Sequence, residues 1–167
     1  MSSEEAREPS QISDLALALG RVPTGLYVVA TQANGVPVGF VASLLVQTGF
    51  DPPTLAVAVA RKRPHLAALR ASGRFGVSIL DAQSRGLMAP FFKPHPEGRG
   101  PFDHIATATA PGGSPLLRDA LAWLECEISG EHDGGGDHVV LFGQVTHGRV
   151  ARPGDPAVHL RKNGLDY

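Results

Sequence analysis

Six short apolar segments, separated by turns rich in glycine and proline, set the strongest limit on how this chain folds. Short segments rich in valine and leucine, with turn residues between them, are typical of β-strands. Asn34-Gly35 separates the first two and favours a tight hairpin, because both residues tolerate a positive φ. The predicted strands cover residues 26–31, 36–47, 54–60, 75–80, 120–128 and 139–150.

Few helices are predicted between these strands. Apolar residues recur at helical spacing over 12–20, and Pro64 is well placed to begin a helix that ends at Gly73. A third short helix is expected over 82–88, and residues 93–115 are expected to form one long surface loop. Because helices and strands do not alternate regularly, the pattern argues against a doubly wound parallel sheet. It favours a mainly β fold, a six-stranded antiparallel split β-barrel with a few short helices.

Length and composition favour a single domain. The chain has 167 residues, a formal net charge of −1 and one cysteine, Cys126. We expect a polar N-terminal tail over residues 1–10 and one folded domain over 11–167. The charge balance predicts no nucleic-acid partner, and the lack of an apolar run of about 18 residues predicts no membrane span. A cytoplasmic protein without internal disulfides is the expectation.

The familiar short motifs for phosphate, metal and nucleophile chemistry are absent from the sequence. There is no G-x-G-x-x-G, no Walker motif, no C-x-x-C, no H-E-x-x-H and no G-x-S-x-G. The seven histidines do not fall at the tight spacing of metal ligands, so we predict no metal site.

Three other stretches are candidates for a binding site. Residues 39–44 place glycine and small side chains in a strand, which suits the close approach of a planar ligand or, alternatively, a bulge or a tight barrel corner. Residues 61–65 gather three cations and a histidine near a helix start, which suits either a phosphate or a solvated surface patch. Residues 134–138 place His138 after a glycine turn, where it is either a functional group near neutral pH or an ordinary surface histidine.

Taken together, these segments resemble the flavin reductase-like family of FMN-binding split barrels. The resemblance runs from about residue 17 to 167. It is carried by the order of residues 22–25, 39–44, 51–53, 60–69, 75–80, 120–127 and 136–138. The ending 159–167 and the segment 19–29 look like the reductase domain of flavodiiron proteins.

The resemblance implies a site for each part of the flavin. The ring and ribityl chain would meet Val41, Ala42, Ser43 and Leu44, with Ser43 at a position where the family often uses a hydroxyl. The phosphate would be held by Ala60, Arg61, Lys62, Arg63, Pro64 and His65. Many relatives have serine and threonine where this chain has Arg63 and His65, and charged donors replace hydroxyls well at a phosphate.

Further residues follow from the same resemblance. Phe92 and Lys93 match a segment that often closes over the flavin. His138 matches a histidine near the nicotinamide, and Tyr167 is expected close by. The cofactor implied is FMN, with FAD as the alternative, and NADH or NADPH as the electron donor. The family usually forms homodimers.

The function implied is an NAD(P)H-dependent flavin reductase that supplies electrons to a flavin-dependent oxygenase or another acceptor. Two alternatives stay open. One is an FMN-binding electron carrier or ferric reductase with little direct NAD(P)H turnover. The other is a β-barrel ligand-binding or interaction domain without flavin.

Overall fold

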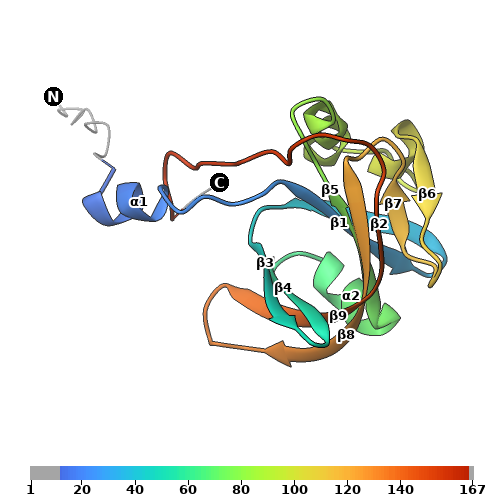
Figure 1. Ribbon diagram of the computed structural model, residues 1–167, viewed down its shortest axis with the longest axis horizontal. Coiled ribbons are helices and arrows are strands. Elements are labelled where there is room, and N and C mark those ends of the chain that lie inside the picture. Colours follow the sequence, from blue (N-terminus) through green and yellow to red (C-terminus); the bar gives the residue numbers. More distant parts are fainter. Residues whose placement is uncertain (1–11, 166–167) are drawn as a thin grey trace, which may run out of the picture.

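Seven antiparallel strands form one strongly curved sheet in the computed structural model, which describes residues 12–165 (Figure 1). The strand order is β2-β1-β5-β8-β9-β4-β3, with β2 and β3 at the two unpaired edges. The strands are β1 (Tyr27–Ala33), β2 (Val36–Ala42), β3 (Leu45–Phe50), β4 (Pro53–Ala60), β5 (Arg74–Ile79), β8 (Ala122–His132) and β9 (His138–Val150). The predicted mainly β, split-barrel architecture is confirmed. The edge strands β2 and β3 do not pair with each other, so the sheet is not closed.

The sheet has one strand more than predicted because the segment 36–47 is two strands. β2 pairs with β1, β3 pairs with β4, and the chain bends at Ser43 and Leu44 between them. The hairpin turn between β1 and β2 is confirmed, since Asn34 and Gly35 have φ angles of 52° and 79°.

Alternation along the strands separates the core from the outer surface. In β4, Leu55, Val57 and Val59 are buried in the main core, while the alanines between them face the other way. Phe75 of β5 and Leu141 of β9 are fully buried in the same core. One strand therefore presents large side chains inward and small ones outward.

The described helices are short, at four to eight residues each. α2 (His65–Ser72) packs on β1 and ends at Gly73, whose φ of 68° suits glycine. The predicted helix over 82–88 is instead a 3₁₀ helix, η1 (Arg85–Phe92). The stretch expected to be one loop contains η2 (Pro101–His104), β6 (Thr107–Thr109) and the start of β7 (Pro115–Leu117). None of the described helices is long and apolar enough to cross a membrane.

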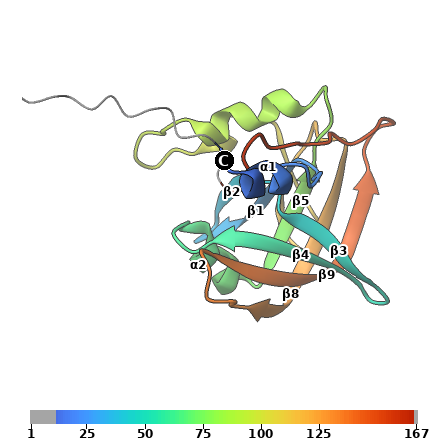
Figure 2. The ribbon, with the colours of Figure 1, turned by 90° about the vertical axis from the view of Figure 1, so that its left-hand side faces the viewer.

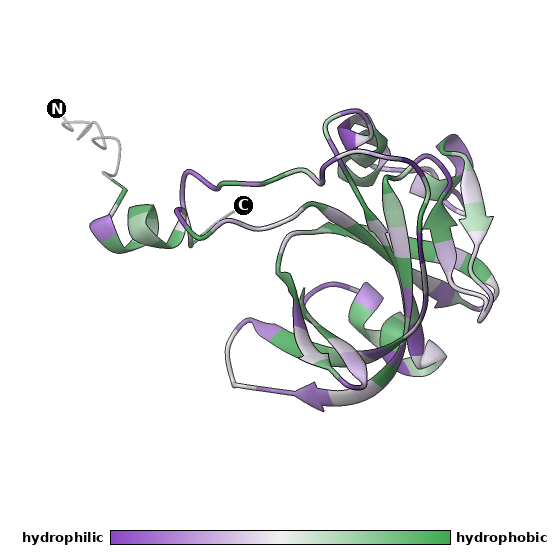
Figure 3. Cartoon of the chain, in the orientation of Figure 1, coloured by the Kyte–Doolittle hydropathy of each residue, from purple (hydrophilic) through white to green (hydrophobic). Residues whose placement is uncertain are grey.

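Both ends of the described chain leave the barrel together as a terminal arm, defined as residues 12–25 and 156–165 (Figures 1 and 2). It carries α1 (Asp14–Leu19), and its two segments are joined by hydrogen bonds. The amide of Thr24 donates to the His159 carbonyl at 3.0 Å, and the amide of Gly164 donates to the Ala16 carbonyl at 2.8 Å. Hydrophobic residues are frequent along the arm (Figure 3). The exposed aliphatic residues of the arm are Ile12, Leu15, Leu17, Leu19, Val22, Val158, Leu160 and Leu165.

Candidate functional site

A mainly apolar groove of about 820 Å³ lies between the base of the terminal arm and the outer face of β3, β4 and β9. Its size falls in the usual range for small-molecule sites. The lining residues are Val22, Pro23, Thr24, Gly25, Tyr27, Ser43, Leu44, Leu45, Val46, Gln47, Ala56, Ala58, Val140, Pro156, Ala157 and Val158. Sequence reasoning gave no site role to the arm residues among them.

The Ser43 hydroxyl is a buried polar group at the groove that has no partner among the described residues. Ser43 is 3% exposed, and its Oγ is buried without a hydrogen-bond partner among the described residues. A buried hydroxyl left unpaired costs about 1–3 kcal/mol, so a ligand that hydrogen-bonds to it gains that energy. Leu44 also lines the groove, whereas Val41 and Ala42 pack their side chains into the two hydrophobic cores. These two residues therefore offer a ligand only their backbone groups.

Strand β4 brings the three predicted stretches together. The Ala58 amide donates to the Leu44 carbonyl at 2.9 Å, which joins the groove to β4. Two residues further on, Ala60 stands opposite His138 of β9. The next amide, that of Arg61, donates to the Asp137 carbonyl at 2.9 Å. Residues that are far apart in the sequence thus meet at one end of β4.

The cations of the 61–63 cluster are not equivalent. The Arg61 guanidinium makes a two-pronged ion pair with Asp133 and donates to the Gly136 carbonyl at 2.5 Å. This pairing holds the pKa of Asp133 well below its ordinary value. Lys62 and Arg63 have no ion-pair partner among residues 12–165. They are the cations left available for an anionic ligand.

His65 lies at the start of α2 directly after Pro64, with its ring against Phe40 of β2. The two ring centroids are 5.2 Å apart, and the Arg63 guanidinium lies 5.2 Å from the Phe40 centroid. Burial and the charge of Arg63 lower the pKa of His65, although a hydrogen bond to the Gly39 backbone acts in the opposite direction. The imidazole is therefore neutral near pH 7. Its Nδ1 is buried without a partner in the described chain, a second unsatisfied polar atom near the cations.

His138 begins β9 with its side chain mostly buried, at 24% exposure. Its Nδ1 lies 2.9 Å from a carboxylate oxygen of Asp137. The imidazole next to Asp137 holds the pKa of that carboxyl below its ordinary value. A carboxylate at Nδ1 favours the tautomer that carries hydrogen there, which leaves Nε2 to interact with a ligand.

The remaining predicted site residues are not brought into the groove. Phe92 ends η1 and is 69% exposed, and neither it nor Lys93 lines the groove. Tyr167 lies outside the described residues.

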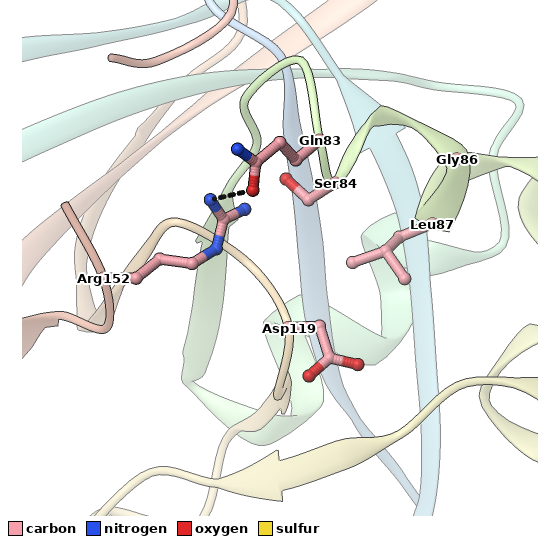
Figure 4. Close-up of a pocket in the computed structure, with 6 residues that line it drawn as sticks. All are labelled: Gln83, Ser84, Gly86, Leu87, Asp119 and Arg152. Carbon is pink, nitrogen blue, oxygen red and sulfur yellow. Dashed lines mark hydrogen bonds between the residues drawn. The ribbon is translucent and has the colours of Figure 1, made fainter. Parts of the chain in front are cut away.

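A second, smaller cavity of about 380 Å³ lies beside the start of η1, lined by Gln83, Ser84, Gly86, Leu87, Asp119 and Arg152 (Figure 4). Its main cation is already paired, because Arg152 binds the Asp81 carboxylate at 2.7 Å and Gln83 at 3.2 Å. Hydrogen bonds from Arg152 and Ser84 hold the pKa of Asp81 well below its ordinary value. This cluster fastens the chain after β9 to the chain after β5, and sequence reasoning did not find it.

Comparison with known proteins agrees with this arrangement. Residues 19–164 match the family model described as a flavin reductase like domain. Diflavin flavoprotein A 1 of Synechocystis sp. is 41% identical over 157 residues, which are 93% of this chain but 27% of that protein. The chain thus spans about a quarter of the length of this relative.

Two solved structures share the fold. Nitrilotriacetate monooxygenase component B from Mycobacterium thermoresistibile superposes with a TM-score of 0.80 at 31% identity, covering 89% of this chain and 82% of that one. An NADH:FAD oxidoreductase from Streptomyces globisporus gives 0.80 at 27% identity, covering 91% and 93%. With the family model matching most of its length, this chain belongs to the flavin reductase-like domain family.

Proposed function

We propose that this protein is an NAD(P)H-dependent flavin reductase that binds FMN along β4. The observation that supports this most directly is the unpartnered Ser43 hydroxyl in an apolar groove. The cations Lys62 and Arg63 follow the end of the same strand. A flat, largely apolar ring with polar edges and an anionic tail matches this distribution of groups.

In this proposal, Ser43 and the backbone of residues 41–44 bind the polar edge of the flavin ring. Lys62 and Arg63 bind its phosphate, while Arg61 holds their loop through Asp133. His138, oriented by Asp137, faces the nicotinamide and positions it. A bound flavin supplies the chemistry, because it accepts hydride from a nicotinamide and passes electrons to an acceptor. FAD is the alternative flavin.

The decisive experiment is an anaerobic absorption spectrum of the purified protein with FMN, followed after NADH and then NADPH are added. Rapid bleaching of bound flavin is the expected result and identifies the donor. If bound flavin stays oxidised with both donors, the reductase function is refuted and the electron-carrier function is favoured. Failure to bind FMN or FAD would refute the site itself.

Variants separate the roles within the site. Ser43→Ala and the double change Lys62→Ala with Arg63→Ala should each weaken flavin binding by about 10-fold or more, because each removes hydrogen bonds to the ligand. The exposed Arg99, changed to alanine, is the matched control and should bind flavin normally. His138→Ala should bind flavin but reduce it slowly. Equal flavin affinity in all variants would refute the assignment.

We also propose that the electrons pass to a separate oxygenase component or to another flavoprotein. One similar structure is described as a monooxygenase component, and the Synechocystis relative is a longer diflavin protein. Stopped-flow mixing of the reduced protein with a candidate acceptor tests this step. A cytoplasmic location remains a prediction.

The exposed aliphatic side chains of the terminal arm support a homodimer. These exposed side chains belong to a segment that projects from the barrel (Figure 1). Exposed apolar surface of this kind marks association sites. Sedimentation should give a dimer, and Leu15→Lys with Val158→Lys should give a folded monomer. A monomeric wild-type protein would refute this proposal.

A further inference from the structure

Two arginines and a histidine lie where the terminal arm joins the barrel. In the arm segment 156–162, the half-buried Ala157, His159 and Arg161 alternate with exposed neighbours. The segment is extended, so His159 and Arg161 project from the same side. The Arg161 Nε is buried and has no partner among the described residues.

Arg85 is the third member of this cluster. The Ala157 amide donates to the Leu80 carbonyl at 2.9 Å, so the arm runs directly beside the chain that enters η1. Ser84 is held to Asp81 by hydrogen bonds of 2.7 to 2.9 Å, which fixes the start of η1 at Arg85. Burial, together with the charges of Arg85 and Arg161, lowers the pKa of His159, which agrees with their proximity.

No ion pair among residues 12–165 neutralises this cluster. Neither Arg85, His159 nor Arg161 forms an ion pair there. The Arg85 and Arg161 charges repel each other when no acid is paired with them, and an anion bound between them removes this repulsion. A bound anion also favours the protonated form of His159. The cluster also adjoins the groove, because Ala157, Val158 and Thr24 line it and His159 pairs with Thr24.

We propose that Arg85, His159 and Arg161 form an anion site that takes a phosphoryl group of the nucleotide electron donor bound in the groove. The proposal rests on the reductase function, since it assigns the donor's phosphate to a site distinct from Lys62 and Arg63. A 2′-phosphate on the adenosine ribose and the pyrophosphate common to both donors have the required chemistry. The first source predicts a preference for NADPH over NADH.

Direct binding tests the site without turnover. The flavin-loaded full chain is titrated calorimetrically at low salt with 2′,5′-ADP, with 5′-ADP and with 5′-AMP. Tighter binding of 2′,5′-ADP than of 5′-ADP assigns the site to the 2′-phosphate, and the reverse order assigns it to the pyrophosphate. Arg85→Ala and Arg161→Ala should each weaken the preferred ligand by about 10- to 100-fold, as expected for charge-assisted hydrogen bonds.

Controls make the result specific. Arg99→Ala, an exposed arginine on another loop, should bind the preferred ligand like the wild type. Arg85→Lys and Arg161→Lys should restore part of the affinity, because they keep the charge. Unchanged nucleotide binding in both alanine variants would overturn the proposal. Alanine variants that change only dimer formation would overturn it as well.

Turnover then separates this proposal from the reductase function. If the site is right and the phosphate is the 2′-phosphate, the ratio of kcat/KM for NADPH to that for NADH falls in the alanine variants. Flavin reduction with no change in either donor's KM would sink the anion site and leave the reductase intact. Nucleotide binding that depends on both arginines, in a protein that does not reduce flavin, would support the anion site and refute the reductase function.

Discussion

Replacing Glu125 by glutamine should destabilise the fold far more than the same change at Glu127, two residues further along β8. The Glu125 side chain is 1% exposed, and its carboxylate accepts hydrogen bonds from the amides of Gly112 at 2.7 Å and Ser114 at 3.0 Å. The Nδ1 of His147 lies 3.2 Å from the same carboxylate. The Glu127 side chain is 60% exposed and serves as the matched control.

The expected magnitude follows from these contacts. A glutamine offers one acceptor oxygen instead of two, so one of the two buried amides is left facing an NH₂ group. An unsatisfied buried donor and the loss of a charged acceptor together cost about 2–4 kcal/mol. For a domain of this size, that corresponds to a fall in Tm of about 5–15 °C.

Urea unfolding at neutral pH measures the difference, with the free energy of unfolding as the readout. If Glu125→Gln is no more destabilising than Glu127→Gln, then the two amide contacts contribute nothing and the reasoning is refuted. Hydrogen exchange adds a local test, because the amides of Gly112 and Ser114 should lose protection in the variant only at position 125.

The effect should also depend on pH. Burial raises the pKa of Glu125, but the hydrogen bonds from Ser114 and Gly112 outweigh it, so its pKa in the folded protein is lowered. Stabilisation by such a group is complete above the pKa of the unfolded chain and is lost as the pH falls through the folded value. The stability gap between wild type and Glu125→Gln should therefore narrow below about pH 4. A constant gap would contradict this.

Two further predictions concern the core. Gly143→Ala places a Cβ 2.7 Å from Phe75 Cζ and 2.8 Å from the Cβ of Cys126, so urea unfolding should show a loss of about 1–3 kcal/mol. Gly136→Ala, where nothing lies within 4 Å, should be nearly neutral, and equal effects would contradict the packing argument. The Cys126 thiol is fully buried and its pKa is raised to about 12. It should resist a thiol reagent such as DTNB until denaturant is added, whereas rapid labelling of the native protein would show that the site opens.

Local sequence patterns predicted most strands and turns well. They failed where a segment's structure depends on pairing with residues far away in the sequence. The segment 36–47 has an unbroken strand pattern, but its halves pair with different strands, and that divides it at Ser43. The short β6 and β7 were missed because three residues beside prolines and glycines carry little strand signal. Their stability comes from pairing with each other and from the burial of Leu116 and Leu117.

The candidate site was predictable in composition but not in the role of each residue. Arg61 appeared in the sequence as one of three equivalent cations, yet it pairs with Asp133, 72 residues away. Glu125 and Glu127 are two residues apart and therefore share one face of β8, yet residues 112–114 hydrogen-bond only to Glu125. The groove was missed as a feature because the arm that forms one wall comes from both ends of the chain.

Strand β4 contributes one face to the core and the opposite face to the groove. Its inward residues Leu55, Val57 and Val59 fill the barrel, and Ala56 and Ala58 between them line the groove. A shift of its pairing by one residue would turn branched side chains into the groove and alanines into the interior. Misregistered folding would therefore abolish stability and ligand binding together. Ligand binding in the groove is for this reason also a reporter of correct strand register.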